Sequence, residues 1–80
     1  MAKKFGIVHT EVLHNLDISL RAKGLYALLC TYADRDRTCF PSISTLSEMS
    51  GVSRRTIERT LKELEEHKIV LKSGNIFSLK

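Results

Sequence analysis

Residues 51–68, GVSRRTIERTLKELEEHK, restrict the fold of this chain more than any other stretch. Ser53 follows a Gly-Val turn and has the chemistry of a helix N-cap, because its hydroxyl can accept a hydrogen bond from an N–H of the first helical turn. Beyond it, Ile57, Leu61 and Leu64 recur at helical spacing and form one apolar stripe. The stretch therefore predicts an amphipathic helix that buries one face in a core.

The charged residues of this predicted helix follow an order that the helix dipole opposes. Arg54, Arg55 and Arg59 lie in the first half, whereas glutamates fill the second half. The dipole favours acidic residues at the N-terminus, and the like charges of Arg55 and Arg59 at i, i+4 cost roughly 0.2–0.5 kcal/mol. A polyanion lying across the first half would remove that repulsion. The order is typical of a recognition helix that faces DNA.

The composition of the chain fits a small nucleic-acid-binding domain. Its 80 residues make one domain with a single core. Lysine and arginine number 13 against 9 acidic residues, which gives a net charge of +4 and an isoelectric point near 9.3. A mildly basic domain suits a nucleic-acid partner. No apolar run has the length of a membrane span or a signal-peptide core, so we expect a cytoplasmic protein, associated with the nucleoid and not with a membrane.

The N-terminal part of the chain predicts a short strand, a helical turn and a longer helix. Phe5–Val8 is an apolar run of strand character, and residues 10–14 suit one helical turn capped by Thr10. After a polar break, Ser19 caps a helix predicted over residues 20–34. Its buried face is expected to contain Ala22, Leu25, Leu29 and Tyr32, with Leu28 beside them.

Gly24 lies inside this predicted helix, where glycine costs on the order of 1 kcal/mol relative to alanine. Close packing of the helix against another element would explain a glycine there. We therefore expect Gly24 to lie at a contact between two elements.

A second helix is predicted immediately before the turn at Gly51. Cys39–Phe40 suits a short strand that Pro41 stops, and Ser42 then caps the helix. Two helices joined by a short turn containing glycine make a helix-turn-helix. The spacing predicts that Ile43, Leu46 and Met49 form the buried side of this helix and that Ser44 and Thr45 point outward.

After Lys68 the hydrophobic period changes from helical to strand-like. Ile69–Lys72 and Ile76–Leu79 are two such runs, and the Ser-Gly-Asn link between them predicts a β-hairpin. The order of elements is that of a winged helix, which is mainly helical with a small hairpin. We expect one domain over residues 1–80, with an N-terminal extension (1–18), a helical core (19–68) and a wing hairpin (69–80).

Residues 40–70 resemble the winged helix-turn-helix family of bacterial plasmid, phage and regulatory proteins, including the N-terminal domains of replication initiators. The resemblance lies in Phe-Pro-Ser before the second helix, Gly-Val-Ser at the turn, and Arg-x-Thr-Ile-x-Arg-x-Leu from Arg54 to Leu61. Leu20–Leu25 also resembles the first helix of that family. The likeness extends over residues 19–72 and is strongest over residues 40–64.

In that family the third helix enters the major groove, the second helix supports it, and the wing touches the backbone or the minor groove. Carried onto this sequence, the resemblance implies a set of DNA-binding residues. They are Ser53, Arg54, Arg55, Thr56 and Arg59 at the bases and flanking phosphates, Ser42, Ser44 and Thr45 at phosphates, Lys62 further along the helix, and Lys72 and Asn75 in the wing.

Two positions depart from the family pattern. Glu58 follows Ile57, where related regulators often carry a basic residue that contacts bases; it either accepts from a cytosine amine or pairs with Lys62. The wing carries only Lys72 and Lys80 as basic residues near it, which weakens the case that the wing grips DNA.

Other classes of function receive less support from the residues. The spacing of the three histidines, Cys30 and Cys39 matches no zinc pattern and no disulfide framework. No nucleophile triad, carboxylate pair or phosphate loop is present, so we expect neither enzymatic activity nor a cofactor. The remaining alternatives are a solvated helix face with Arg59–Glu63 and Lys62–Glu66 pairs, and a winged helix that docks on a protein without contacting DNA.

The sequence therefore predicts sequence-specific binding of double-stranded DNA by a plasmid or phage regulator, a replication protein or a DNA-transfer protein. No small-molecule ligand is evident. Winged helices often dimerise to read two half-sites, and a homodimer or a larger nucleoprotein complex is a possible assembly. Any dimer would form through Phe5–Leu16, through the helix that begins at Leu20, or only on DNA.

Overall fold

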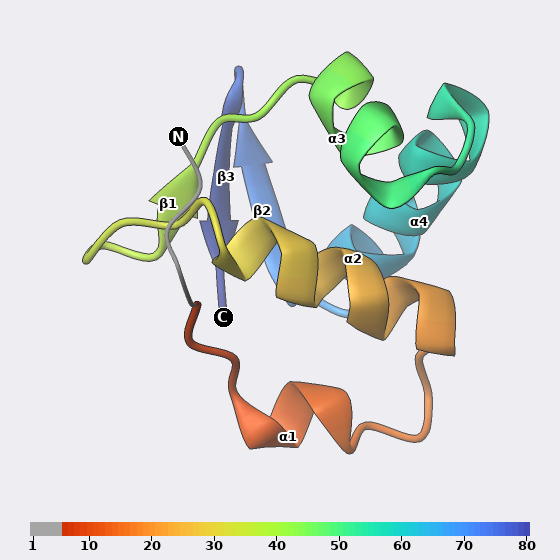
Figure 1. Ribbon diagram of the computed structural model, residues 1–80. Coiled ribbons are helices and arrows are strands. Elements are labelled where there is room, and N and C mark those ends of the chain that lie inside the picture. The colour runs from red at the N-terminus through yellow and green to blue at the C-terminus, as the bar shows by residue number, and fades with distance from the viewer. Residues whose placement is uncertain (1–5) are drawn as a thin grey trace.

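The computed structural model describes residues 6–80, in which helices and a small sheet follow one another as a winged helix (Figure 1). This confirms the fold class predicted from the sequence. In chain order the elements are α1 (Thr10–Leu13), α2 (Leu20–Cys30), β1 (Thr38–Cys39), α3 (Ile43–Ser50), α4 (Arg54–Glu66), β2 (Val70–Ser73) and β3 (Ile76–Leu79).

The three strands form one antiparallel sheet with the order β1-β3-β2. Cys39 pairs with Phe77, and Leu71 pairs with Ser78. The wing hairpin was predicted correctly, although β1 begins one residue earlier and β2 one residue later than expected. The loop of the hairpin has two residues rather than three, and Gly74 supplies the positive φ of 60° that such a tight loop needs.

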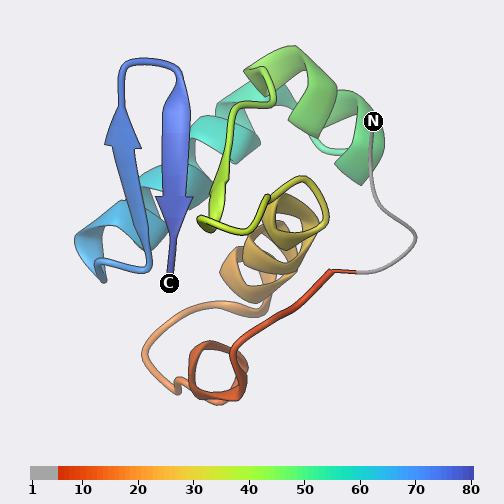
Figure 2. The ribbon, with the colours of Figure 1, turned by 90° about the vertical axis from the view of Figure 1, so that its left-hand side faces the viewer.

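The core lies between α2, α3, α4 and the inner face of the sheet. Figure 2 shows α2 in the middle of the domain, with α3 on one side and α1 on the other. The predicted stripe of Ile57, Leu61 and Leu64 on α4 is buried in this core. Tyr26 and Val70 are also fully buried, although neither was predicted as a core residue.

The N-terminal segment differs from the prediction. Residues 6–8 form no strand, and Phe5 lies outside the described residues. Thr10 is the first residue of α1 and not its cap, because His9 holds the N-cap position without a side-chain hydrogen bond. Backbone groups of this segment bond to side chains instead of to a strand: Tyr26 Oη accepts from the His9 N–H at 3.0 Å.

Helix α2 ends at Cys30, four residues before the predicted end. The Thr31 hydroxyl donates to the Leu28 carbonyl at 2.6 Å, and the next amides bond three residues back, which tightens the chain into a turn. Tyr32 therefore lies beyond the helix and packs against the core from that turn. The expectation for Gly24 was wrong, because a Cβ built there meets no atom within 4 Å.

The buried side of α3 is shorter than predicted. Leu46 is fully buried, but Met49 is 60% exposed because the last turn of α3 extends past the core. Ser44 and Thr45 were expected to point outward, and both are half-buried. Amphipathic spacing identified the inward face of this helix but not where the core beneath it ends.

A hydrogen-bonded cap fastens α4 to the start of α2. The Glu63 carboxylate accepts from the Ser19 N–H at 2.8 Å and from the Ser19 hydroxyl at 2.9 Å. The Ser19 hydroxyl in turn accepts from the Ala22 N–H and caps α2. The bond from the Ser19 N–H holds the pKa of Glu63 below its ordinary value of 4.5, because hydrogen bonds to the ionised form favour ionisation.

This cap predicts a pH-dependent contribution to stability. The folded protein lowers the pKa of Glu63, so the contribution is complete above pH 4.5 and is lost as pH falls from there through the folded pKa. Replacing Glu63 by Ala should lower the free energy of unfolding at pH 7 by about 1 kcal/mol, the scale of a partly exposed helix cap. Urea titrations at pH 7 and pH 3 measure it, and Glu66→Ala is the matched control.

The Glu63→Ala variant and the parent protein should become similar in stability at pH 3. An equal difference at both pH values would contradict a role for the ionised carboxylate.

Two glycines should respond to alanine in opposite directions. Gly24 lies in the interior of α2 with open space around it, so Gly24→Ala should stabilise the domain by about 1 kcal/mol. Gly51 has a φ of 75°, which alanine adopts only with strain, so Gly51→Ala should destabilise by about 1–2 kcal/mol. Thermal unfolding of both variants at low protein concentration tests this, and shifts of the same sign would refute it.

Candidate nucleic-acid interface

The turn between α3 and α4 is fixed by bonds of its own residues. The Ser47 hydroxyl donates to the Val52 carbonyl at 2.5 Å, and the Gly51 N–H bonds to the Ser47 carbonyl at 3.0 Å. The left-handed conformation of Gly51 ends α3 and redirects the chain. These contacts set the angle at which α4 leaves the turn.

Helix α4 begins at the predicted cap. The Ser53 hydroxyl accepts from the Thr56 N–H at 3.2 Å and lies 3.0 Å from the Thr56 hydroxyl. The helix leaves the N–H groups of its first residues, Arg54 and Arg55, without partners inside the helix. Together with the positive end of the dipole, they form a surface that favours an anion.

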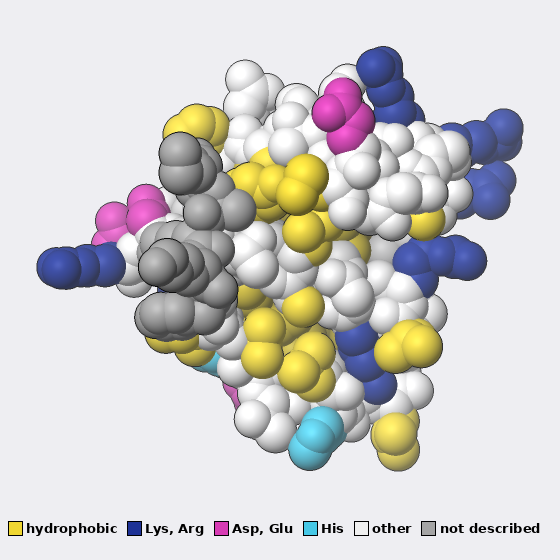
Figure 3. Space-filling view, viewed as in Figure 1, with side chains coloured by type: hydrophobic (Ala, Val, Ile, Leu, Met, Phe, Trp, Pro, Cys, Tyr) yellow, Lys and Arg dark blue, Asp and Glu magenta, His cyan; other side chains and the backbone are white. Residues whose placement is uncertain are grey.

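A basic surface runs along the outer face of α4. We define it by Arg54, Arg55, Arg59 and Lys62, all of which are exposed. Figure 3 shows lysine and arginine side chains projecting from the edge of the molecule beside the α3–α4 turn. These side chains belong to a helix whose opposite face is buried, so their backbone positions are fixed by the core.

The side chains of the basic surface form no ion pair within 4.0 Å among residues 6–80. Among residues 6–80, a single pair of a basic and an acidic side chain lies within 4.0 Å, that of His9 Nδ1 and Glu11 Oε1 at 3.9 Å. The Arg59–Glu63 and Lys62–Glu66 pairs of the alternative are therefore absent from this part of the chain, and so is a Glu58–Lys62 pair. Glu63 is held by Ser19 instead. The charge pairs named in the alternative of a solvated helix face are thus not formed among the described residues.

The inner side of α4 supports this surface. Thr60 is buried, and its hydroxyl donates to the Thr56 carbonyl at 2.6 Å. Thr56 itself is half-buried, so only part of it is accessible to a ligand. A buried threonine bonded one turn back accounts for the polar position in an otherwise apolar stripe.

The N-terminus of α3 presents a second polar site. The Ser42 hydroxyl accepts from the Thr45 N–H and donates to the Thr45 hydroxyl, both at 3.0 Å. The proton of Ser42 is thus engaged inside the cap, while the Thr45 hydroxyl keeps its own proton for an external acceptor. Ser42 is exposed, whereas Ser44 and Thr45 are half-buried.

The structure brings the wing next to this site. A hollow of about 300 Å³ is lined by Ser42 together with Lys72 and Asn75 of the wing, and by Pro41, Ile43 and Phe77. Lys72 Nζ lies 5.9 Å from the centre of the Phe77 ring, within the range of a cation–π contact. Lys80 is at the opposite end of β3 from Asn75 (Figure 1), so it does not belong to this group.

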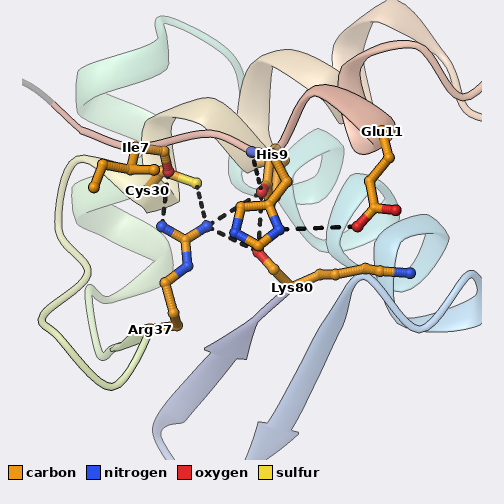
Figure 4. A network of polar contacts seen from close by, with 7 residues as sticks. Ile7, His9, Glu11, Cys30, Arg37 and Lys80 are labelled. Atoms are coloured by element: carbon orange, nitrogen blue, oxygen red, sulfur yellow. Dashed lines mark hydrogen bonds and ion pairs between the residues drawn. The ribbon is translucent and has the colours of Figure 1, made fainter.

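A polar network that the sequence did not predict fastens the other side of the domain. Arg37 donates to the carbonyls of Ile7 at 2.7 Å and Lys80 at 2.8 Å, and to Tyr26 Oη at 3.2 Å (Figure 4). The Tyr26 hydroxyl also donates to the Lys80 carbonyl. Burial raises the pKa of Tyr26. Sequence patterns gave no signal for this network, because Ile7, Tyr26, Arg37 and Lys80 are far apart in the chain.

The two cysteines are buried and unbonded to each other. Burial raises the pKa of the Cys39 thiol to about 11, which suppresses the reactive thiolate. No group of three metal-ligating side chains occurs in residues 6–80. In the same range, no helix has the length and apolar character needed to cross a bilayer.

The chain belongs to the helix-turn-helix domain family, because the model of that family matches residues 16–70, more than half of its length. A comparison with curated proteins found no match. Membership indicates DNA as the partner. Domains of this class typically bind and do not catalyse.

Arg37 should be essential for stability and dispensable for binding. Replacing Arg37 by Ala removes four hydrogen bonds from a charged donor, the fourth of them a long one to Cys30 Sγ, and should cost about 2–3 kcal/mol. Arg35→Ala, an exposed neighbour with the same charge, should cost less than about 0.5 kcal/mol. Urea unfolding compares the two, and equal losses would contradict the structural role of Arg37.

Proposed function

We propose that this protein binds double-stranded DNA sequence-specifically and that α4 enters the major groove with its N-terminal half leading. The observation that carries the proposal is the unpaired basic surface on a helix whose other face is anchored in the core. An α-helix fits the width of the major groove. The positive end of its dipole and three arginines then meet the polyanion first.

The arginines are the candidates for reading bases. Arginine bidentate to guanine is the commonest specific contact and discriminates by about 1–3 kcal/mol against a wrong base. Arg54 and Arg55 lie in the first turn of α4, and Arg59 lies one turn after Arg55. Lys62 follows on the same face and suits a flanking phosphate. Glu58, unpaired with Lys62, is available to accept from a cytosine amine.

The hydroxyl and wing residues are the candidates for positioning the domain on the backbone. Phosphate contacts fix register without reading sequence. Thr45 offers a free hydroxyl proton beside the α3 N-terminus, and Ser53 and Thr56 lie at the start of α4. The hollow that joins Ser42 to the wing supports one continuous phosphate site with Lys72 and Asn75, and Ser44 lies beside it, half-buried.

The biological role we infer is that of a mobile-element protein: a plasmid or phage regulator, a replication protein or a DNA-transfer protein. The resemblance of residues 40–64 supports this role. DNA recognition requires no catalytic group or cofactor, and the proposed site is built entirely from side chains that bind. We place the protein in the cytoplasm with its DNA.

Selection from a random pool of double-stranded oligonucleotides, at two salt concentrations, tests the function directly. We expect one enriched motif whose binding weakens steeply with salt, because phosphate contacts release counterions. No enrichment at either salt concentration would overturn the proposal and favour a winged helix that docks on a protein.

Removing two arginines should abolish specific binding without unfolding the domain. The variant Arg55→Ala with Arg59→Ala loses two exposed side chains that make no ion pair in residues 6–80. We expect affinity for the selected motif to fall at least about 100-fold, with a thermal midpoint within about 2 °C of the parent.

Arg35→Ala is the control for this experiment, because it removes one positive charge from the α2–β1 loop on the other side of the domain (Figure 1). It should retain nearly all specific affinity. A large fall in the midpoint of the double variant would mean that Arg55 and Arg59 are structural.

A further inference from the structure

The start of α2 carries a basic side chain that does not belong to the DNA-binding residues proposed above. Arg21 follows the Ser19 cap by two positions and is exposed. Its guanidinium takes part in no ion pair within 4.0 Å in the described range 6–80. The position of Arg21 relative to α4 therefore decides what this free charge can contact.

Two observations place Arg21 beside the middle of α4. Arg21 and Ile57 of α4 line the same hollow. The pKa of Glu63 is lowered first by the hydrogen bond from the Ser19 N–H and, to a lesser degree, by the positive charge of Arg21. Ile57 and Glu63 are about 9 Å apart along the axis of α4, and Arg59 lies between them. Arg21 therefore borders the basic surface of α4 at the level of Arg59.

A helix in the major groove has a phosphate backbone on each side. The groove is about 12 Å wide and a helix with its side chains about 10–12 Å across, so the elements that flank the helix each face one strand. In Figure 1, α3 lies above α4 and the start of α2 lies below it. The candidates for phosphate contacts on α3, Ser42 and Thr45, serve the first side. The start of α2 faces the other side.

Basic side chains extend to this second side. Figure 3 shows that lysine and arginine side chains continue along one edge of the molecule from the α3–α4 turn towards the start of α2. We propose that Arg21 is a further DNA-binding residue, which binds the phosphate backbone on the α2 side of α4 while the arginines of α4 contact the bases. A guanidinium binds phosphate oxygens through two parallel N–H bonds. Such a contact fixes the register of the domain without reading sequence.

The inference rests on the proposed function, because it adds a contact to the same complex. A purely structural use of Arg21 would be to neutralise Glu63. The Glu63 carboxylate already accepts two hydrogen bonds from Ser19, and Arg21 does not approach it within 4.0 Å. Removing Arg21 should therefore leave the fold intact, with a thermal midpoint within about 2 °C of the parent.

The variant Arg21→Ala should weaken binding to all DNA sequences by a similar factor. We expect affinity for the selected motif to fall about three- to tenfold. The slope of log K against log salt should become shallower by about 0.9, the contribution of one phosphate. Selection with the variant should return the motif of the parent. Arg21→Lys keeps the positive charge and should retain most of the affinity and the full slope.

Lys23→Ala is the matched control, because it removes the same charge from the same helix. Residues two positions apart in a helix point in nearly opposite directions. Lys23 is half-buried and does not line the hollow beside Ile57. We expect Lys23→Ala to keep affinity within about twofold of the parent. Equal losses for Arg21→Ala and Lys23→Ala would mean that only net charge matters and would overturn the proposal.

Neutral phosphates locate the contact. Single phosphates of the selected duplex are replaced by uncharged methylphosphonates, one position at a time. At the phosphate that Arg21 binds, this replacement should weaken binding of the parent but not of Arg21→Ala, because the two changes remove the same interaction. Additive losses at every position would overturn the inference and leave DNA binding intact. If the parent enriches no motif at all, the proposed function fails and the Arg21 contact fails with it.

Discussion

Burial of one face of α4 is the constraint on which the rest of this structure depends. Ile57, Leu61 and Leu64 enter the core together, and each buried aliphatic side chain of this size contributes about 1.5–3 kcal/mol. A helix anchored in this way has no freedom to rotate about its axis. The outward direction of Arg55 and Arg59 is therefore a consequence of hydrophobic packing and not of any contact that the arginines make.

The two ends of α4 differ in their contacts: the first half exposes basic side chains, and the second half bonds to the start of α2. Three helices, α2, α3 and α4, each begin at a serine whose hydroxyl accepts from the N–H three residues on. Glu63, near the end of α4, also bonds to the serine that caps α2. Glu63 lies four residues after Arg59, at the spacing of a helical ion pair, but its carboxylate is bonded to Ser19. Arg59 therefore has no ion-pair partner within 4.0 Å among residues 6–80.

Local chemistry made α4 and the wing predictable, because caps, hydrophobic period and a Gly-Asn loop act over a few residues. The predictions were wrong or missing where contacts between distant parts of the chain determine which residues are buried or bonded. Helical spacing predicted that Met49 is buried, but that spacing does not indicate how far the core extends beneath α3. Tyr26 and Arg37 were missed because they bond to residues up to 54 positions away. DNA contacts of the site residues remain a prediction.

The Arg37 network has a consequence for the path of the chain. One guanidinium holds the backbone of Ile7 and that of Lys80, so the two ends of the described chain lie together, on the side away from the α3–α4 turn (Figure 1). At Ile7 and at Lys80 the backbone therefore lies at nearly the same place, on the side of the domain away from the α3–α4 turn. A single side chain thus closes the described chain into a loop whose two ends share one side of the domain, while α4 and its basic surface remain accessible on another.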